Sequence, residues 1–176
     1  MFRDYFNQER NQAMSIDVQE AIKRSIQTEK NAMNFYQLGA VRMKNQDARK
    51  TFELLAREER EHAGQFFKIY TGTEIPSLDA FLDTPPDNES SWMTSITRLV
   101  DADFTEQKAL ELAMEREKNL EEALLETAAK IGDADVKSVF ELNAKETHNH
   151  YLLIESEYAR IMGMVHESDM DTYVRE

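Results

Sequence analysis

The sequence contains no cysteine among its 176 residues. This absence excludes disulfides, a thiolate nucleophile and any iron or zinc site that is ligated by cysteine within the chain. Basic residues are also scarce, since 21 lysines and arginines stand against 34 acidic residues and give a formal net charge of −13. Such a chain is poorly suited to bind a phosphate backbone or an anionic membrane surface. We therefore expect neither nucleic acid nor a membrane as a partner.

Long apolar runs are missing as well. No stretch approaches the ~20 consecutive apolar residues that span a bilayer. The segment from Met1 to Gln12 is polar and charged, where a secretory signal would be apolar. We therefore expect a soluble, cytoplasmic protein, and its length is close to that of a single domain.

Only five glycines and three prolines interrupt the sequence, and strong helix formers fill the intervals between them. This composition predicts an all-α protein. The first helix should begin after Ser15, whose hydroxyl can cap it. Four long helices are expected, with approximate bounds Ser15 to Met43, Asp47 to Tyr70, Thr105 to Ile131 and Val136 to Met162.

The segment 71–104 differs in character from these helices. Pro76, Pro85 and Pro86 break any helix there, and only Trp92 to Val100 is typical of a short helical piece. A connection this long suits two antiparallel hairpins between which the chain returns along a four-helix bundle. The chain then divides into an N-terminal extension, the bundle and a C-terminal tail, at residues 1–14, 15–163 and 164–176.

Acidic and imidazole side chains interrupt the apolar face of every predicted helix. Each lies in a series of apolar residues that steps by three or four positions, as one helix face requires. A bundle core does not bury several such groups unless something neutralises them. The groups at these inward positions are Glu29, Glu59, His62, Glu117, Glu146 and His150.

An internal repeat supports this grouping. At an offset of 88 residues Glu29 falls on Glu117 and His62 falls on His150. The two hairpins therefore look like copies, and an approximate twofold axis would bring their acids and histidines to a shared centre.

The repeat is imperfect at one position. Glu59 falls on Thr147, whereas Glu146 falls on Glu58. A glutamate three or four residues before a histidine shares its helix face, so Glu146 can still act together with His150. Glu58 itself is expected on a solvated face.

Carboxylate oxygen and imidazole nitrogen are ligands for hard and borderline divalent cations. Four carboxylates would carry four negative charges into the core, and two divalent ions would balance them. We therefore predict a dinuclear site that holds two divalent ions, for which iron or manganese is better suited than a soft, thiolate-preferring metal, with zinc as a further substitute.

At these residues the chain resembles the rubrerythrin branch of the ferritin-like superfamily, over about Ser15 to Met162. The resemblance implies a ferritin-like four-helix bundle made of two helical hairpins joined by a long crossover connection. It rests on Glu29, Tyr36, Phe52, Ala56, Glu59, His62, Glu146 and His150.

The resemblance also implies a role for each ligand. Glu59 and Glu146 would bridge the two irons, Glu29 and Glu117 would be terminal ligands, and each histidine would face one metal. Tyr36 lies two turns from Glu29, so its hydroxyl is a candidate for orienting a metal-bound carboxylate.

The chain departs from rubrerythrins proper in two respects. They carry an extra glutamate three residues after the third-helix ligand, where this chain has Leu120, and Glu121 is a candidate replacement one residue further on. They also carry a small iron domain ligated by cysteines, and this chain has none. The resemblance is therefore to a stand-alone member that takes electrons from an external donor such as a rubredoxin-like protein.

The family's activities are the reduction of hydrogen peroxide at a diferrous site and the oxidation of ferrous iron by oxygen or peroxide, usually in a homodimer. We therefore expect a peroxide-reducing di-iron oxidoreductase that is a homodimer. One alternative is a ferroxidase or iron-handling protein. The other is a metal-free helical scaffold whose buried acids bind a partner.

Overall fold

The computed structural model describes residues 16–101 and 104–163, and every regular element in that part of the chain is a helix. The predicted extension, the Ser15 cap and the predicted tail lie outside the described residues. None of the described helices is long and apolar enough to cross a membrane. The four long helices are α2 (Val18–Arg42), α3 (Gln46–Lys68), α6 (Glu106–Ala128) and α7 (Ala134–Ile161).

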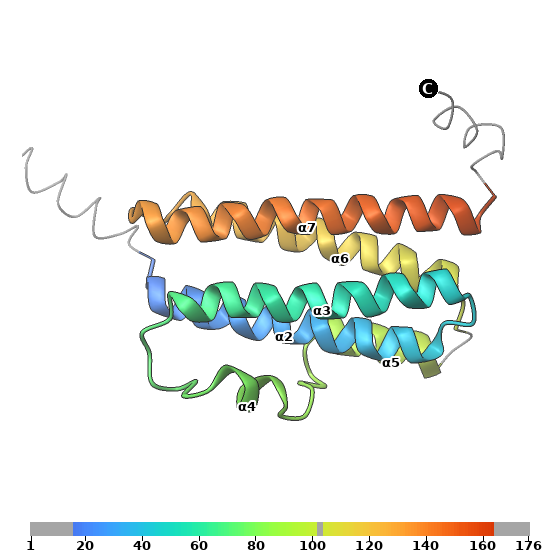
Figure 1. Ribbon diagram of the computed structural model, residues 1–176, viewed down its shortest axis with the longest axis horizontal. Helices are drawn as coiled ribbons and strands as arrows, with labels where there is room; N and C mark the ends of the chain where they lie inside the picture. The colour runs from blue at the N-terminus through green and yellow to red at the C-terminus, as the bar shows by residue number, and fades with distance from the viewer. Residues whose placement is uncertain (1–15, 102–103, 164–176) are drawn as a thin grey trace, which may run out of the picture.

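The long helices form two antiparallel hairpins that lie against each other (Figure 1). One hairpin pairs α2 with α3, the other pairs α6 with α7, and α3 packs on α7 between them. The prediction of an all-α bundle made of two hairpins is confirmed. The observed bounds differ from the predicted ones by less than one helical turn.

Polar side chains cap the N-termini of all four long helices. The Asn45 side chain accepts hydrogen bonds from the first backbone N–H groups of α3, and Thr105 and Asp133 cap α6 and α7 in the same way. The cap of α2 is Asp17, which accepts a hydrogen bond of 3.0 Å from the backbone N–H of Glu20. Asp17 directly precedes the first helical residue, so the helix begins two residues later than the prediction, which had it begin directly after Ser15.

The connection between the hairpins contains two short helices, α4 (Leu78–Leu82) and α5 (Ser91–Asp101). The predicted helical piece lies within α5, which packs against α2 and α6. No prediction was made for α4, a single turn that the Ser77 side chain caps and that lies along α3. The connection is also tied to α2, because the buried Lys30 amino group donates hydrogen bonds to the Thr84 hydroxyl and to the carbonyl of Pro85.

Aromatic side chains from α2, α3 and α5 pack together in the core. Tyr36 meets Phe52 edge to face at a ring-centroid distance of 5.1 Å, and Phe35 meets Trp92 at 5.3 Å. Gly39 allows α2 to approach this cluster closely, since a Cβ atom there would lie 2.6 Å from the Phe52 ring. The aromatic contacts and the close approach at Gly39 therefore hold α2 and α3 together.

Candidate metal centre

Five acidic and imidazole side chains gather in the core between the four long helices. All of them lie on the inward stripe of their helix, so the amphipathic pattern that folds the bundle also buries them together. Five of the six predicted ligands are thereby removed from water. The exposed fractions are 0% for Glu29, Glu59 and Glu117, 3% for His62 and 4% for His150.

Glu59 occupies the middle of this group. Its Oε2 lies 3.2 Å from Nδ1 of His62, which is one turn further along α3. Its Oε1 lies 3.1 Å from Nδ1 of His150, which comes from α7. The two imidazole rings stack with centroids 5.0 Å apart. One carboxylate therefore joins the histidines of both hairpins.

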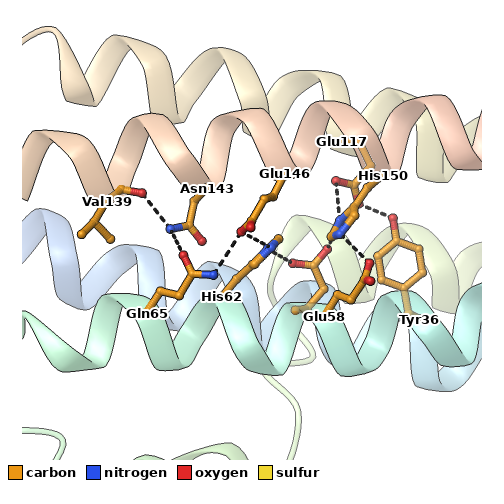
Figure 2. A network of polar contacts seen from close by, with 10 residues as sticks. Tyr36, Glu58, His62, Gln65, Glu117, Val139, Asn143, Glu146 and His150 are labelled. Carbon is orange, nitrogen blue, oxygen red and sulfur yellow. Dashed lines mark hydrogen bonds and ion pairs between the residues drawn. The ribbon is translucent and has the colours of Figure 1, made fainter.

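The outer nitrogens of the two histidines contact carboxylates of the opposite hairpin. Nε2 of His62 lies 3.1 Å from Oε2 of Glu146, and Nε2 of His150 lies 3.0 Å from Oε2 of Glu58 (Figure 2). Each histidine thus takes its outer partner from the other helix pair. We call these two contacts the reciprocal pairs.

The reciprocal pairs place a carboxylate at the outer nitrogen of each ring. A carboxylate at Nε2 can hold a proton there, which would free Nδ1 to bind a metal ion once its own proton has left. Histidine ligands of metal ions usually have their second nitrogen held in this way. Ligand atoms of Glu59, His62 and His150 lie within 4.8 Å of one another, close enough for one metal ion to reach all three.

Glu117 enters the centre from α6 and is held by a tyrosine. The Tyr36 hydroxyl donates a hydrogen bond to Oε1 of Glu117, while Oε2 lies 3.6 Å from Nδ1 of His150. Tyr36 is fully buried. The tyrosine therefore fixes the orientation of this carboxylate.

The charges of the buried groups are strongly coupled. Burial alone would raise the pKa of Glu59, but hydrogen bonds from His150 and His62 outweigh it and lower the pKa to about 2. Burial alone would lower the pKa of His150, but the Glu117 and Glu59 carboxylates raise it to about 11. In the metal-free protein a proton on imidazole therefore neutralises part of the cluster.

Glu29 has no such neutralising partner. Both of its carboxylate oxygens are buried, and neither has a hydrogen-bond donor among the residues the structure describes. Burial raises the pKa of Glu29 well above its ordinary value, and the nearby carboxylates of Glu59 and Glu117 raise it further. A buried carboxylate that lacks a donor and lies beside two other carboxylates is suited to bind a cation, and the residues present therefore fit a carboxylate- and imidazole-bound metal ion.

A comparison with protein families matches the chain to Rubrerythrin over residues 20–158. The chain belongs to the rubrerythrin family. The comparisons found no matching curated protein and no matching solved structure. The matched region contains all of α3 and α6, and it contains α2 and α7 except for the start of α2 and the end of α7. It also contains the whole buried Glu/His cluster, so the family match and the cluster concern the same part of the chain.

Glu146, the sixth predicted ligand of this rubrerythrin-family chain, lies at the edge of the centre. Its side chain is 36% exposed, and its Oε2 accepts a hydrogen bond of 3.0 Å from the Gln65 amide as well as contacting His62. The Gln65 carbonyl in turn accepts a hydrogen bond from Asn143. Glu146 therefore contacts the Nε2 side of His62, whereas Glu59 contacts Nδ1. It belongs to a chain of polar contacts with Gln65 and Asn143 (Figure 2).

Glu121, the candidate replacement for the extra carboxylate of rubrerythrins proper, faces a different residue. Its Oε2 lies 3.0 Å from Nδ1 of His148, whose side chain is 49% exposed. The two residues form a surface pair between α6 and α7. The structure does not bring Glu121 to the buried cluster.

The sequence analysis did not predict the positions of two residues at this site. Glu58, interpreted as part of a solvated face, has a side chain that is 39% exposed and also contacts His150 through one of the reciprocal pairs. Thr147 is fully buried at the inward position that Glu146 was expected to fill. The internal repeat contained both signals, because it aligns Glu58 with Glu146 and Glu59 with Thr147.

A cavity of about 240 Å³ between α3 and α7 reaches the centre. It is lined by both histidines and by both outer carboxylates, so the two imidazole rings of the buried cluster border it. The lining residues are Glu58, Glu61, His62, Gln65, Glu146, Asn149 and His150.

Proposed function

We propose that this protein is a non-haem di-iron oxidoreductase of rubrerythrin type, which reduces hydrogen peroxide with electrons from an external donor. The observation that carries the proposal is the buried cluster in which Nδ1 of His62 and Nδ1 of His150 face the same carboxylate, Glu59. Membership of the rubrerythrin family supports iron as the metal and peroxide as the oxidant.

The ligand roles that we propose follow the geometry. Glu59 would hold both ions, because its two oxygens face different histidines. His62 and His150 each bind one ion through Nδ1. Glu29 and Glu117 complete the set as terminal ligands, since both are fully buried beside Glu59. These three carboxylates offset most of the charge of two divalent ions.

Glu146 takes a different role in this proposal from the bridging role that the family resemblance implies. Glu146 and Glu58 hold the Nε2 atoms of the two histidines and so fix the ring orientation. Their partial exposure is consistent with this outer position, because a carboxylate that faces water needs no metal ion to balance its charge.

Bound iron would supply the electrons that reduce peroxide, cycling between the ferrous and ferric states. The protein contributes a fixed ligand geometry, a dry core and a cavity bordered by both histidines. Tyr36 holds the Glu117 carboxylate through its hydroxyl. Reduction of one peroxide to two waters consumes two electrons and two protons, and the electrons come from a separate carrier because the chain has no cysteine-ligated iron of its own.

Anaerobic loading with ferrous iron, followed by stopped-flow mixing with peroxide and separately with oxygen, tests this proposal. We expect rapid oxidation of the bound iron by peroxide and slower oxidation by oxygen. Iron that binds but does not react with peroxide would overturn the peroxidase function.

A ferroxidase or iron-handling function is the second candidate, and the cavity favours it. The carboxylates of Glu58, Glu61 and Glu146 line the opening and would attract ferrous ions. Supplying ferrous iron in large excess of the sites separates the two functions. An iron-handling protein continues to oxidise the excess, whereas a peroxidase stops once its own site is oxidised and no reductant is present. A dimer in size-exclusion chromatography would count against storage, which needs a shell of many subunits.

A metal-free scaffold is the alternative of another class. Elemental analysis after expression in iron-supplied medium decides this question, because about two metal ions per chain are incompatible with it. Purified protein without bound metal that also fails to take up iron would favour the scaffold.

A further inference from the structure

Thr147 is a buried residue of α7 whose only side-chain polar atom makes no hydrogen bond among the described residues. Its side chain is fully buried, and its hydroxyl has no hydrogen-bond partner within the described ranges. A threonine inside a helix commonly donates to the carbonyl four residues earlier. Thr28 and Thr127 do so here, at 2.9 and 2.7 Å. The Thr147 hydroxyl makes no such bond.

The internal repeat aligns Thr147 with Glu59. Thr147 lies one turn before His150 on the same helix face, as Glu59 lies one turn before His62. The first hairpin therefore presents a carboxylate to the centre where the second presents a hydroxyl. Glu146 does not compensate, because its carboxylate contacts the Nε2 side of His62.

We propose that Thr147 marks a position at which a small anion, supplied from solution, bridges the two metal ions opposite Glu59, and that the Thr147 hydroxyl donates a hydrogen bond to this anion. The inference rests on the proposed metal site. The threonine side chain has two heavy atoms fewer than that of glutamate, and it provides no carboxylate to compete with an anion for the metal ions. A cavity is lined by His150, which lies one turn from Thr147 on the same helix face.

The charge of the cluster agrees with this assignment. The buried carboxylates of Glu29, Glu59 and Glu117 carry three negative charges at most, one fewer than would balance two divalent ions. One bound anion supplies the difference. After oxidation of the metals the excess of positive charge is larger, so the oxidised protein should bind the anion more tightly than the reduced protein does.

Azide is the probe that we choose, because it is small, anionic and changes the visible absorption of ferric iron when it binds. Azide is titrated into the iron-loaded, oxidised protein and into three variants at Thr147. Thr147→Ser keeps the hydroxyl and should bind azide as the unchanged protein does. Thr147→Val keeps the shape without the hydroxyl and should bind azide about five- to tenfold more weakly. Thr147→Glu should bind azide more than tenfold more weakly, because its carboxylate takes the bridging position.

The Glu variant has a second readout that needs no azide. A fourth buried carboxylate should tighten the binding of Mn²⁺, measured by calorimetry, by at least tenfold. Thr127→Val is the matched control, since it removes a helix hydroxyl that already bonds to Ala123 and lies away from the cluster. This control should change neither azide affinity nor Mn²⁺ affinity.

The iron content of each protein is measured before azide is added, which separates the two proposals. Unchanged protein that takes up no iron would overturn the proposed function and this inference together. Iron-loaded protein whose azide affinity is the same with threonine, serine and valine at position 147 would overturn only the inference. Circular dichroism reports whether Thr147→Glu folds, and the serine and valine variants decide the matter if it does not.

Discussion

Among the acids within residues 16–101 and 104–163, Glu29 has the least favourable surroundings in the metal-free protein. It is fully buried and lacks a donor among the described residues, and other carboxylates lie beside it. A single side chain in this position destabilises the fold unless it binds a proton or a cation. Glu29 therefore links the stability of the protein to metal and to pH.

Replacing Glu29 by Gln should stabilise the metal-free protein at neutral pH. The pKa of Glu29 is raised in the folded state, so its contribution to stability is fully present below its ordinary pKa of 4.5 and is lost as the pH rises through the raised value. The amide keeps the shape and carries no charge. We expect a gain of at least about 1 kcal/mol in the free energy of unfolding, measured by thermal or urea denaturation after treatment with chelator.

The exposed Glu122 on α6 provides the control for this substitution. Glu122→Gln should leave the stability within about 0.5 kcal/mol of the unchanged protein. A Glu29→Gln variant that is no more stable than this control would contradict our account of Glu29.

The affinity for metal should rise with pH, because metal ions and protons compete for the same groups. In the metal-free protein the carboxylates of Glu117 and Glu59 raise the pKa of His150 to about 11, so a proton must leave the imidazole when a metal ion binds. Calorimetric titration with Mn²⁺ between about pH 6 and pH 8 measures this effect. We expect tighter binding at the higher pH and release of protons to the buffer, and a pH-independent affinity would refute the competition.

At the scale of the helices, the first hairpin depends on close contact between α2 and α3 at Gly39. Gly39→Ala should destabilise the protein. Alanine gains up to about 1 kcal/mol of helix propensity, but its Cβ would lie 2.6 Å from the buried Phe52 ring, and overpacking of this kind costs about 1–3 kcal/mol. We expect a net lowering of the melting temperature by a few degrees.

Gly64 in α3 is the matched control for Gly39. The nearest atom to a Cβ at Gly64 is a Leu78 methyl carbon at 3.8 Å, which is an ordinary contact. Gly64→Ala should therefore leave the melting temperature unchanged or raise it. Equal effects of the two substitutions would show that packing at Phe52 is not the reason for glycine at position 39.

Helix periodicity explains how far the sequence could predict this site. Positions of one face recur every three or four residues, so Glu29, Glu59 and Glu117 were placed correctly within the core. The same rule cannot separate Glu146 from Thr147. Both are within four residues of His150, yet consecutive residues point about 100° apart around the helix.

The outer contacts were harder to predict for a different reason. Glu58 meets His150 only because α3 packs on α7, and the pattern within one helix carries no information on its neighbour. Likewise, α4 is a single turn whose apolar residues pack on the first hairpin, too short for a periodic signal. The contact of Glu58 and the position of α4 depend on tertiary packing, which the local sequence pattern does not report.

At the scale of the whole molecule, metal binding should stabilise the bundle, because the cluster joins residues from all four long helices. Saturating Mn²⁺ at about 100 times its dissociation constant should add about 2.7 kcal/mol to the free energy of unfolding. Glu59→Ala should abolish this gain and the loading of two metals while leaving the circular dichroism spectrum helical. Undiminished metal content in Glu59→Ala would reject its bridging role.

The reciprocal pairs make each helical hairpin incomplete without the other. His62 is oriented by an acid of the second hairpin and His150 by an acid of the first, and these acids occupy equivalent positions in the repeat. Two identical copies of one hairpin, associated about a twofold axis, would form the same contacts without any fusion of the chains. Joining two such copies in one polypeptide frees each to accumulate its own substitutions, and the difference between Glu59 and Thr147 is a divergence that a symmetric ancestor could not have had.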